Sequence, residues 1–214
     1  MLWQNSFSPV VSICIAVNCL FYVLQHQFSQ PLLTWLALWP LPFTATSEAL
    51  AMRWNLPSFE LWQLVTYAFL HANIIHLATN MLGLWMLGRP LEQYWGWRRF
   101  SAYYLICLTG AGCVQLLVAS IAAGSGSYYP TIGASGAVFG ILLAIGMLFP
   151  DQRLMFLLLP IAIKAKWFVL AFGLFELWAG ITGTQAGIAH FAHLGGMLVG
   201  FLVLLYWRTI ESVR

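Results

Sequence analysis

The stretch Gly133-Ala134-Ser135-Gly136-Ala137-Val138-Phe139-Gly140 places one serine among small residues, at the start of an apolar run that ends at Pro150. Its glycines let other helices approach closely. The start of a helix carries free N–H donors, which suit a nucleophile whose reaction forms an oxyanion beside it. Taken alone, the stretch is more typical of simple helix packing, so the rest of the chain has to decide between the two interpretations.

The composition indicates an integral membrane protein. Of the 214 residues, 61% are hydrophobic and 7% are charged, whereas a soluble domain carries about 25% charged residues. The net charge is +3, but the basic residues are dispersed, which argues against a nucleic-acid partner. All four cysteines fall inside apolar runs without metal-ligand spacing, and we interpret them as small hydrophobic residues.

Six apolar runs are long enough, or nearly so, to cross a bilayer as helices, which takes about 20 residues. The first run has no basic residue ahead of it and no convincing cleavage site, so we expect a retained helix and not a removed signal peptide. The long connection at 30–61 is rich in Trp and Pro and is expected to lie on the membrane surface. We place the six helices at 9–25, 65–87, 100–122, 135–149, 154–181 and 188–207. The predicted fold class is an all-α polytopic membrane protein with six transmembrane helices, a membrane-associated first loop and one domain over 1–214.

The charges of the loops orient this bundle. Lys and Arg gather in the connections after the second, fourth and sixth runs, and Arg53 alone lies in the opposite set of loops. The positive-inside tendency therefore places both termini in the cytoplasm. The fourth run is short, about 22 Å as a helix, against a hydrocarbon core of about 30 Å. Ser135 is therefore expected below the outer surface, reached by a loop that dips inward.

Polar residues inside membrane helices are costly and are candidates for function. His76 and Asn80 are four residues apart and share one face of the second predicted helix. In the sixth, His193 lies on the same side as Gly196. All these groups belong to the outer parts of helices that run inward, so they can meet Ser135 at one depth. The constellation permits acyl transfer, with His193 as general base and the Ser135 N–H, His76 and Asn80 binding the oxyanion.

Other ionisable residues receive weaker assignments. A triad would need a carboxylate beside the histidine, and Glu176 is the acidic residue inside an apolar run. We interpret Glu176 as a hydrogen-bonded structural acid and expect a Ser–His dyad. His71 and His190 fit either a supporting polar network or the membrane interface, and His26 fits the interface.

In combination, these motifs resemble the rhomboid family of intramembrane serine proteases. The resemblance rests on 133–136, on His76 and Asn80 with His71 ahead of them, and on Ala192-His193-Leu194-Gly195-Gly196 followed by Gly200. It implies a rhomboid-like bundle with Ser135 as nucleophile, His193 as base, and an oxyanion hole lined by His76 and Asn80. It also implies that the fifth helix and its following loop gate access. The residues with implied supporting or structural roles are Gly88, Glu92, Gly133, Gly136, Phe139, His71 and His190.

Two positions depart from the family pattern. Many relatives carry Trp-Arg where this chain has Trp62-Gln63, which leaves open how the first loop is held. Some relatives have tyrosine at the position of Phe139, stacked on the catalytic imidazole. Phenylalanine keeps the ring face, so we expect the stacking on His193 to persist.

The resulting prediction is a serine endopeptidase that cuts transmembrane or membrane-proximal segments of membrane proteins near the outer face. Its partners are transmembrane protein substrates and the lipid bilayer, and no metal or cofactor is expected. The lack of a transit peptide and of a soluble accessory domain favours the bacterial cytoplasmic membrane. The alternatives are a catalytically inactive relative that binds membrane clients and a haem- or metal-binding membrane protein. The sequence has no HExxH motif and no pair of helices with stacked histidines, which argues against haem or metal binding. It also has no inverted repeat, which argues against a transporter.

Overall fold

The computed structural model describes residues 7–155, 162–184 and 187–213, and these residues are mostly helical. In chain order the elements are α1 (Pro9–Gln27), α2 (Ser29–Leu36), α3 (Ala45–Trp54), α4 (Gln63–Thr66), the 3₁₀ turn η1 (Tyr67–Phe69), α5 (Ile74–Gly83), the π-helical turn η2 (Leu84–Gly88), α6 (Arg89–Trp95), α7 (Trp97–Gly124), α8 (Ser135–Leu148), β1 (Arg153–Met155), β2 (Ala162–Lys164), α9 (Ala165–Thr182) and α10 (His190–Val213).

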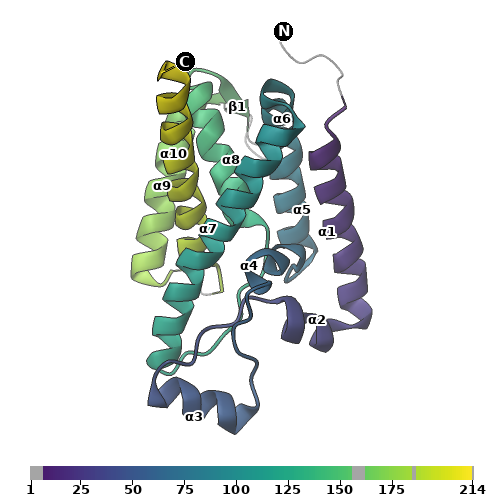
Figure 1. Ribbon diagram of the computed structural model, residues 1–214, viewed down its shortest axis with the longest axis vertical. Helices are drawn as coiled ribbons and strands as arrows, with labels where there is room; N and C mark the ends of the chain where they lie inside the picture. Colours follow the sequence, from purple (N-terminus) through teal and green to yellow (C-terminus); the bar gives the residue numbers. More distant parts are fainter. Residues whose placement is uncertain (1–6, 156–161, 185–186, 214) are drawn as a thin grey trace.

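Four of these helices are long and apolar enough to cross a membrane, namely α1, α7, α9 and the His190–Ile210 part of α10. The apolar helix α8 is shorter, with 14 residues. Helices α5 and α6 follow one another through η2 and together cover about 33 Å at 1.5 Å per residue. The long elements lie side by side, and α1 begins at the same end of the molecule at which α10 ends (Figure 1). The chain is therefore a multi-pass membrane protein.

The predicted continuous helix at 65–87 is wrong, because the chain leaves the helical conformation at 70–73, between η1 and α5. Helix α5 begins one residue after Asn73, whose Oδ1 accepts a hydrogen bond from the His76 N–H at 2.9 Å. On α1, Gln25 bonds both backbone groups of His71 at 3.1 Å. These side chains replace hydrogen bonds that a continuous helix would make, so the break is tolerated in apolar surroundings.

The predicted helix at 154–181 also begins too early, and its part at 156–161 lies outside the described residues. Strands β1 and β2 pair antiparallel, and α9 begins directly after Lys164. The carboxylate of Asp151 lies 3.0 Å from the Lys164 Nζ and 2.9 Å from the Lys166 Nζ. These two ammonium groups lower the pKa of Asp151. A cluster of charged side chains therefore lies at the end of the bundle where α9 begins.

The core lies where α7, α8 and α10 meet. Tyr103 on α7 donates from its hydroxyl to the Gly140 carbonyl of α8 at 2.8 Å. Tyr67 in η1 donates to the Leu108 carbonyl of α7 at 2.9 Å. Both rings are fully buried, and each phenol finds an acceptor inside the apolar core. The Tyr103 hydrogen bond joins α7 to α8, and the Tyr67 hydrogen bond connects the turn before α5 to α7.

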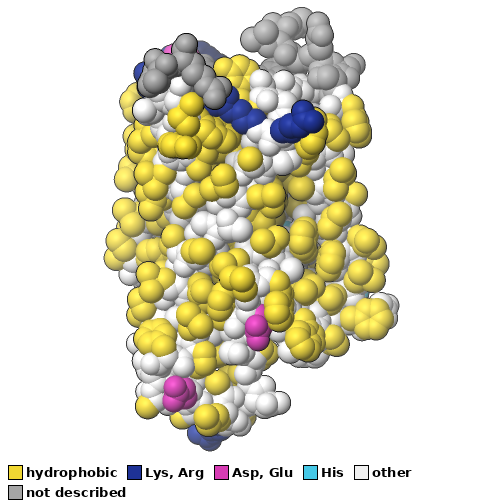
Figure 2. All heavy atoms as spheres, viewed as in Figure 1, with side chains coloured by type: hydrophobic (Ala, Val, Ile, Leu, Met, Phe, Trp, Pro, Cys, Tyr) yellow, Lys and Arg dark blue, Asp and Glu magenta, His cyan; other side chains and the backbone are white. Residues whose placement is uncertain are grey.

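The outer surface of the bundle is apolar. Figure 2 shows hydrophobic side chains along the body of the molecule, with Lys and Arg gathered mainly at the end where α1 begins and α10 ends. Large hydrophobic residues remain more than half exposed on several long helices, among them Leu20, Leu117, Leu174, Trp178 and Leu202. An apolar band of this extent is stable against lipid acyl chains and not against water.

The first loop is held in place by Gln63. Helices α2 and α3 lie across the end opposite to the cationic one (Figure 1). The Gln63 side chain is buried, accepts from the Trp39 N–H at 3.1 Å and donates to the Ser58 carbonyl at 3.4 Å. The Tyr128 hydroxyl donates to the Pro57 carbonyl at 2.8 Å. A glutamine therefore pins the loop at the position where the resemblance leads to arginine.

Glu92 on α6 caps the start of α1. Its two carboxylate oxygens accept from the N–H groups of Val10 at 3.0 Å and Val11 at 2.9 Å. The Glu92 side chain is buried. The first N–H groups of a helix have no partner within it, and a negative charge at this end is favourable. The contact connects α1 to α6.

Replacing Glu92 is expected to destabilise the fold. Glu92→Ala leaves two buried N–H donors without an acceptor and should lower the free energy of unfolding by about 1–3 kcal/mol, while Glu92→Gln keeps one acceptor and should lose less. Thermal unfolding in detergent measures both. Glu60→Ala, at an exposed site, is the control, and equal midpoints for Glu92→Ala and Glu60→Ala would contradict the capping role.

Candidate active site

Ser135 is the first residue of α8 and is positioned by the loop that precedes it. The Gly133 N–H donates to the Tyr67 carbonyl at 2.9 Å, and Leu38 and Thr131 exchange two backbone hydrogen bonds at 2.8 and 2.9 Å. Because α8 begins at Ser135, the Ser135 N–H has no acceptor within its own helix. The serine therefore presents a hydroxyl and a free backbone donor at one point.

Ser135 and His193 are in direct contact. The Ser135 Oγ lies 2.7 Å from the His193 Nε2, although the two residues belong to different helices. The helices come this close because glycines face each other: a Cβ on Gly196 would collide with the carbonyl oxygen of Gly136. The structure thus brings together the two residues that the sequence analysis assigns as nucleophile and base.

Phe139 supports the His193 ring. The two rings are parallel within 2°, with centroids 4.2 Å apart. Phe139 lies one turn after Ser135 on α8, so one helix carries both the serine and the ring that orients the imidazole. This is the stacking that the resemblance implies at position 139.

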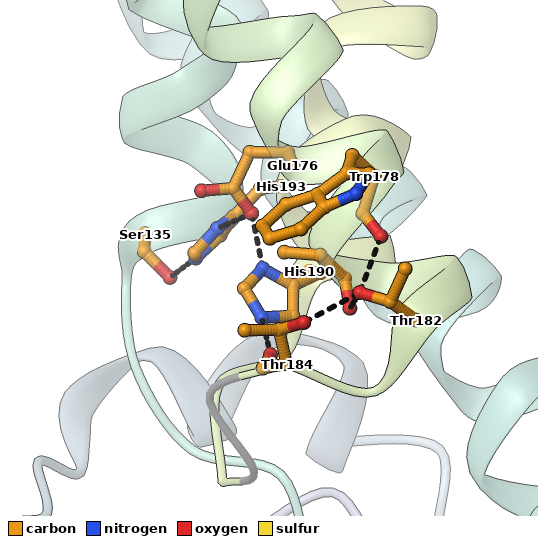
Figure 3. A network of polar contacts seen from close by, with 8 residues as sticks. Ser135, Glu176, Trp178, Thr182, Thr184, His190 and His193 are labelled. Atoms are coloured by element: carbon orange, nitrogen blue, oxygen red, sulfur yellow. Dashed lines mark hydrogen bonds and ion pairs between the residues drawn. The ribbon is translucent and has the colours of Figure 1, made fainter.

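Glu176 on α9 contacts the same imidazole from the other side. Its Oε2 lies 2.8 Å from the His193 Nδ1 and 2.7 Å from the His190 Nδ1, and all three residues are buried (Figure 3). The sequence analysis did not assign this acid to the histidine and expected a dyad, whereas the structure brings a carboxylate into hydrogen-bond contact with His193. The rotation of α9 about its axis turns this carboxylate inward, and that rotation is set by tertiary packing. In the sequence, the one indication of a role for Glu176 was that it is an acidic residue within an apolar run.

His76 lies beside Ser135 on the loop side. Its Nδ1 accepts from the Ala72 N–H at 3.3 Å, which leaves the hydrogen on Nε2. A Cβ on Gly133 would lie 2.8 Å from the His76 Nε2 and 3.9 Å from the Ser135 Oγ. The missing side chain of Gly133, which has a φ of +120°, therefore leaves a space bordered by the hydroxyl and by an N–H donor.

Asn80 and His71 take more peripheral positions. Asn80 is buried and donates from its Nδ2 to the His76 carbonyl at 2.9 Å, which occupies one of its two amide hydrogens. The His71 ring is fully buried and meets the His76 ring edge-on, with centroids 5.0 Å apart. Neither His71 ring nitrogen has a hydrogen-bond partner among the described residues. His71 and His190 are thus both buried, and within the described part of the chain the His190 ring has hydrogen-bond partners whereas the His71 ring has none.

One group in the described part of the chain has the donor types and spacing of a metal site. The ligand atoms of Glu176, His190 and His193 all lie within 4.8 Å of one another. The same atoms already form short hydrogen bonds, and the second nitrogen of His193 is bonded to Ser135. Hydrogen bonds alone therefore account for this arrangement. The expectation that the site holds no metal stays a prediction.

A cavity of about 250 Å³ borders His190. Its lining includes polar groups of Gln115, Tyr129 and Thr184, from α7 and from the connections on either side of the site. A water molecule takes up about 30 Å³, so the space can hold several. Polar solvent can therefore reach the neighbourhood of the histidines from this side.

The family model described as "Rhomboid domain" matches residues 58–209, which include every residue of this site. The chain belongs to the rhomboid family. Curated relatives include RHOMBOID-like protein 2 of Arabidopsis thaliana, 32% identical over 75% of this chain and 47% of its own length. Rhomboid protease GluP of Bacillus subtilis is 36% identical over 66% of this chain and 25% of its own length.

Rhomboid protease GlpG of Pectobacterium atrosepticum is 27% identical over 100% of this chain and 67% of its own length. The chain thus spans half or less of the plant and Bacillus relatives and two thirds of GlpG. Its match to GlpG extends over the first loop and α1 as well as over the site-bearing helices.

The space at Gly133 gives a test of the site. Gly133→Ala should place a methyl group against the His76 Nε2 and slow reaction at Ser135 by about 100-fold, the usual effect of losing an oxyanion donor. The reaction rate with a fluorophosphonate in detergent measures this.

Gly126→Ala is the matched control. Gly126 lies in the same loop with a φ of +101° and has open space around its Cβ position, so it carries similar backbone strain without the block. Equal rates for the two alanine variants would contradict an oxyanion site beside Gly133.

Proposed function

We propose that this rhomboid is an intramembrane serine endopeptidase in which Ser135 and His193 cleave peptide bonds. The observation that supports this most directly is the 2.7 Å contact between the Ser135 Oγ and the His193 Nε2 at the start of a helix. Relatives of the chain are named rhomboid proteases. An inactive client-binding relative would have no need for an aligned hydroxyl and imidazole.

The first half of the reaction forms an acyl-enzyme. The Ser135 Oγ attacks the carbonyl carbon of the scissile bond while the His193 Nε2 takes the hydroxyl proton. When the tetrahedral intermediate collapses, the C–N bond breaks and His193 returns the proton to the leaving amine. In the second half, a water molecule gives a proton to His193 and attacks the ester carbonyl. The acyl C–O bond then breaks, and His193 returns the proton to the Ser135 Oγ.

The negative oxygen of the tetrahedral intermediate fits the space beside Gly133. The His76 Nε2–H borders this space, and the Ser135 N–H at the start of α8 is the second candidate donor to an oxyanion. The second amide hydrogen of Asn80, one helical turn after His76, is the third candidate donor. All three donors belong to helices, α5 and α8, which hold them in place before the oxyanion forms.

The substrates are proposed to be transmembrane or membrane-proximal segments of membrane proteins, cut near the outer face. We take the chain to cross six times, counting α5–α6 and α8, and the gathering of Lys and Arg at one end of the bundle supports a cytoplasmic location for that end and for both termini. A stable helix hides its carbonyl groups in internal hydrogen bonds, so segments with small residues and locally weak helix are favoured. We propose the bacterial cytoplasmic membrane as the location.

An activated serine can be tested directly. Purified wild-type protein in detergent should react covalently with a fluorophosphonate probe, while Ser135→Ala and His193→Ala should remain unlabelled because they lack the nucleophile or its base. Ser101→Ala is the control, since its hydroxyl donates to the Trp97 carbonyl within α7. A folded wild-type protein that does not react contradicts the proposal and favours a client-binding function.

The oxyanion donors are tested by turnover of a single-span substrate. His76→Ala and Asn80→Ala should each lower kcat by about 10–1,000-fold while thermal stability is kept. Thr79→Val is the control on the same helix, because the Thr79 hydroxyl bonds carbonyls of its own turn. Full activity in both single variants and in the double variant would remove these residues from the oxyanion hole.

A further inference from the structure

Glu176 stands at the centre of a buried polar network that joins α8, α9 and α10 (Figure 3). One oxygen of its carboxylate accepts from the Nδ1 atoms of His190 and His193, and the Nε2 of His193 meets the Ser135 hydroxyl. The exposed fractions of the three ionisable side chains are 10% or less. A single imidazole therefore separates this carboxylate from the nucleophile.

We infer that Glu176 is a positioning residue for His193, so that the site works as a Ser135–His193–Glu176 triad and not as a dyad. The inference rests on the proposed function and adds an acid from α9 to it. His190 belongs to the same arrangement, because it and His193 bind the same carboxylate oxygen of Glu176.

The first step of the argument is the tautomer of His193. A carboxylate oxygen 2.8 Å from the Nδ1 accepts a hydrogen bond, so the hydrogen of neutral His193 resides on Nδ1. The Nε2 then carries a lone pair and faces the Ser135 hydroxyl at 2.7 Å. This is the tautomer that a general base requires. Without Glu176, either nitrogen could carry the hydrogen.

The second step is the charge that develops during the reaction. When His193 takes the serine proton it becomes a cation, in a region where charges are poorly solvated. The Glu176 carboxylate lies in hydrogen-bond contact with that cation and stabilises it. The benefit exists only after proton transfer, so it should appear in kcat and not in substrate affinity.

The third step explains how a carboxylate can remain charged inside the bundle. His190 has an acceptor at each ring nitrogen, namely Glu176 Oε2 at 2.7 Å and the Thr184 carbonyl at 3.1 Å. The Glu176 carboxylate thus has two imidazole nitrogens as hydrogen-bond partners, which offsets the cost of burying it.

The test compares Glu176→Gln, Glu176→Ala and Glu176→Asp with the wild type in cleavage of a single-span substrate in proteoliposomes. Glu176→Gln and Glu176→Ala should lower kcat about 10–100-fold with KM within about twofold, as expected for loss of support to a general base. Glu176→Asp retains the charge and should recover part of this loss. His190→Gln should also lower kcat, and its effect should shrink when combined with Glu176→Gln.

Thr182→Val is the matched control on α9. It removes a hydroxyl that bonds the Trp178 carbonyl and the Thr184 side chain, so it disturbs the same end of α9 without touching the carboxylate. Its kcat should equal that of the wild type. Wild-type kcat in folded Glu176→Gln and Glu176→Ala would overturn the inference and leave the proposed function intact. An equal loss in Thr182→Val would also overturn it, because general loosening of α9 would then be the cause.

Nitrogen-15 NMR of histidine-labelled wild-type protein reports the tautomer even if the Glu176 variants do not fold. Hydrogen on the His193 Nδ1 supports the inference, and hydrogen on Nε2 in the resting protein overturns it. Loss of wild-type activity with a chelator and its return with Zn²⁺ would identify a metal site and overturn it as well. An inactive, folded wild type contradicts the proposed function, and the inference falls with it.

Discussion

The contact between the backbones of α8 and α10 sets the geometry of the whole site. Gly196 and Gly136 lie so close that neither helix can move apart without opening a cavity, and a side chain on Gly196 would displace α8. Ser135 directly precedes Gly136, and His193 lies one turn before Gly196. The distance between hydroxyl and imidazole therefore depends on how closely these two helices pack.

Several buried polar side chains in this bundle form hydrogen bonds with groups on other structural elements. The tyrosine hydroxyls of the core bind backbone carbonyls, Glu92 binds the first N–H groups of α1, and Gln63 binds the first loop. The Glu176 carboxylate follows the same rule, with two imidazoles as donors. In each case a polar side chain connects two elements that are distant in sequence, since an unpaired polar group is costly in lipid.

The placement of Glu176 on α9 has a consequence for motion. Ser135 and His193 belong to α8 and α10, which are locked together by glycines, whereas α9 packs against them from one side (Figure 1). The contact from Glu176 to His193 persists only while α9 stays in place. Displacement of α9 would therefore break the hydrogen bond between Glu176 and His193.

The sequence by itself determined those properties of the protein that depend on composition and on the local spacing of residues. Composition and spacing indicate a membrane bundle, a serine at a helix start and the pair His76 and Asn80 on one face, because these properties depend on residues close together in the chain. The rhomboid motifs likewise point to Ser135 and His193, since each motif is a short run of consecutive residues. The break before α5 has no such local signal, because Gln25, which satisfies it, lies on α1.

Only the tertiary structure decided which way Glu176 points. Helix α9 is apolar on nearly every side, with exposed residues such as Leu174 and Trp178 as hydrophobic as its buried ones. In a soluble helix, polar residues mark the face that meets water, but lipid is as apolar as a protein core. Periodicity therefore leaves the rotation of such a helix about its axis undetermined. The packing of α9 against α8 and α10 fixes that rotation and brings the carboxylate to His193.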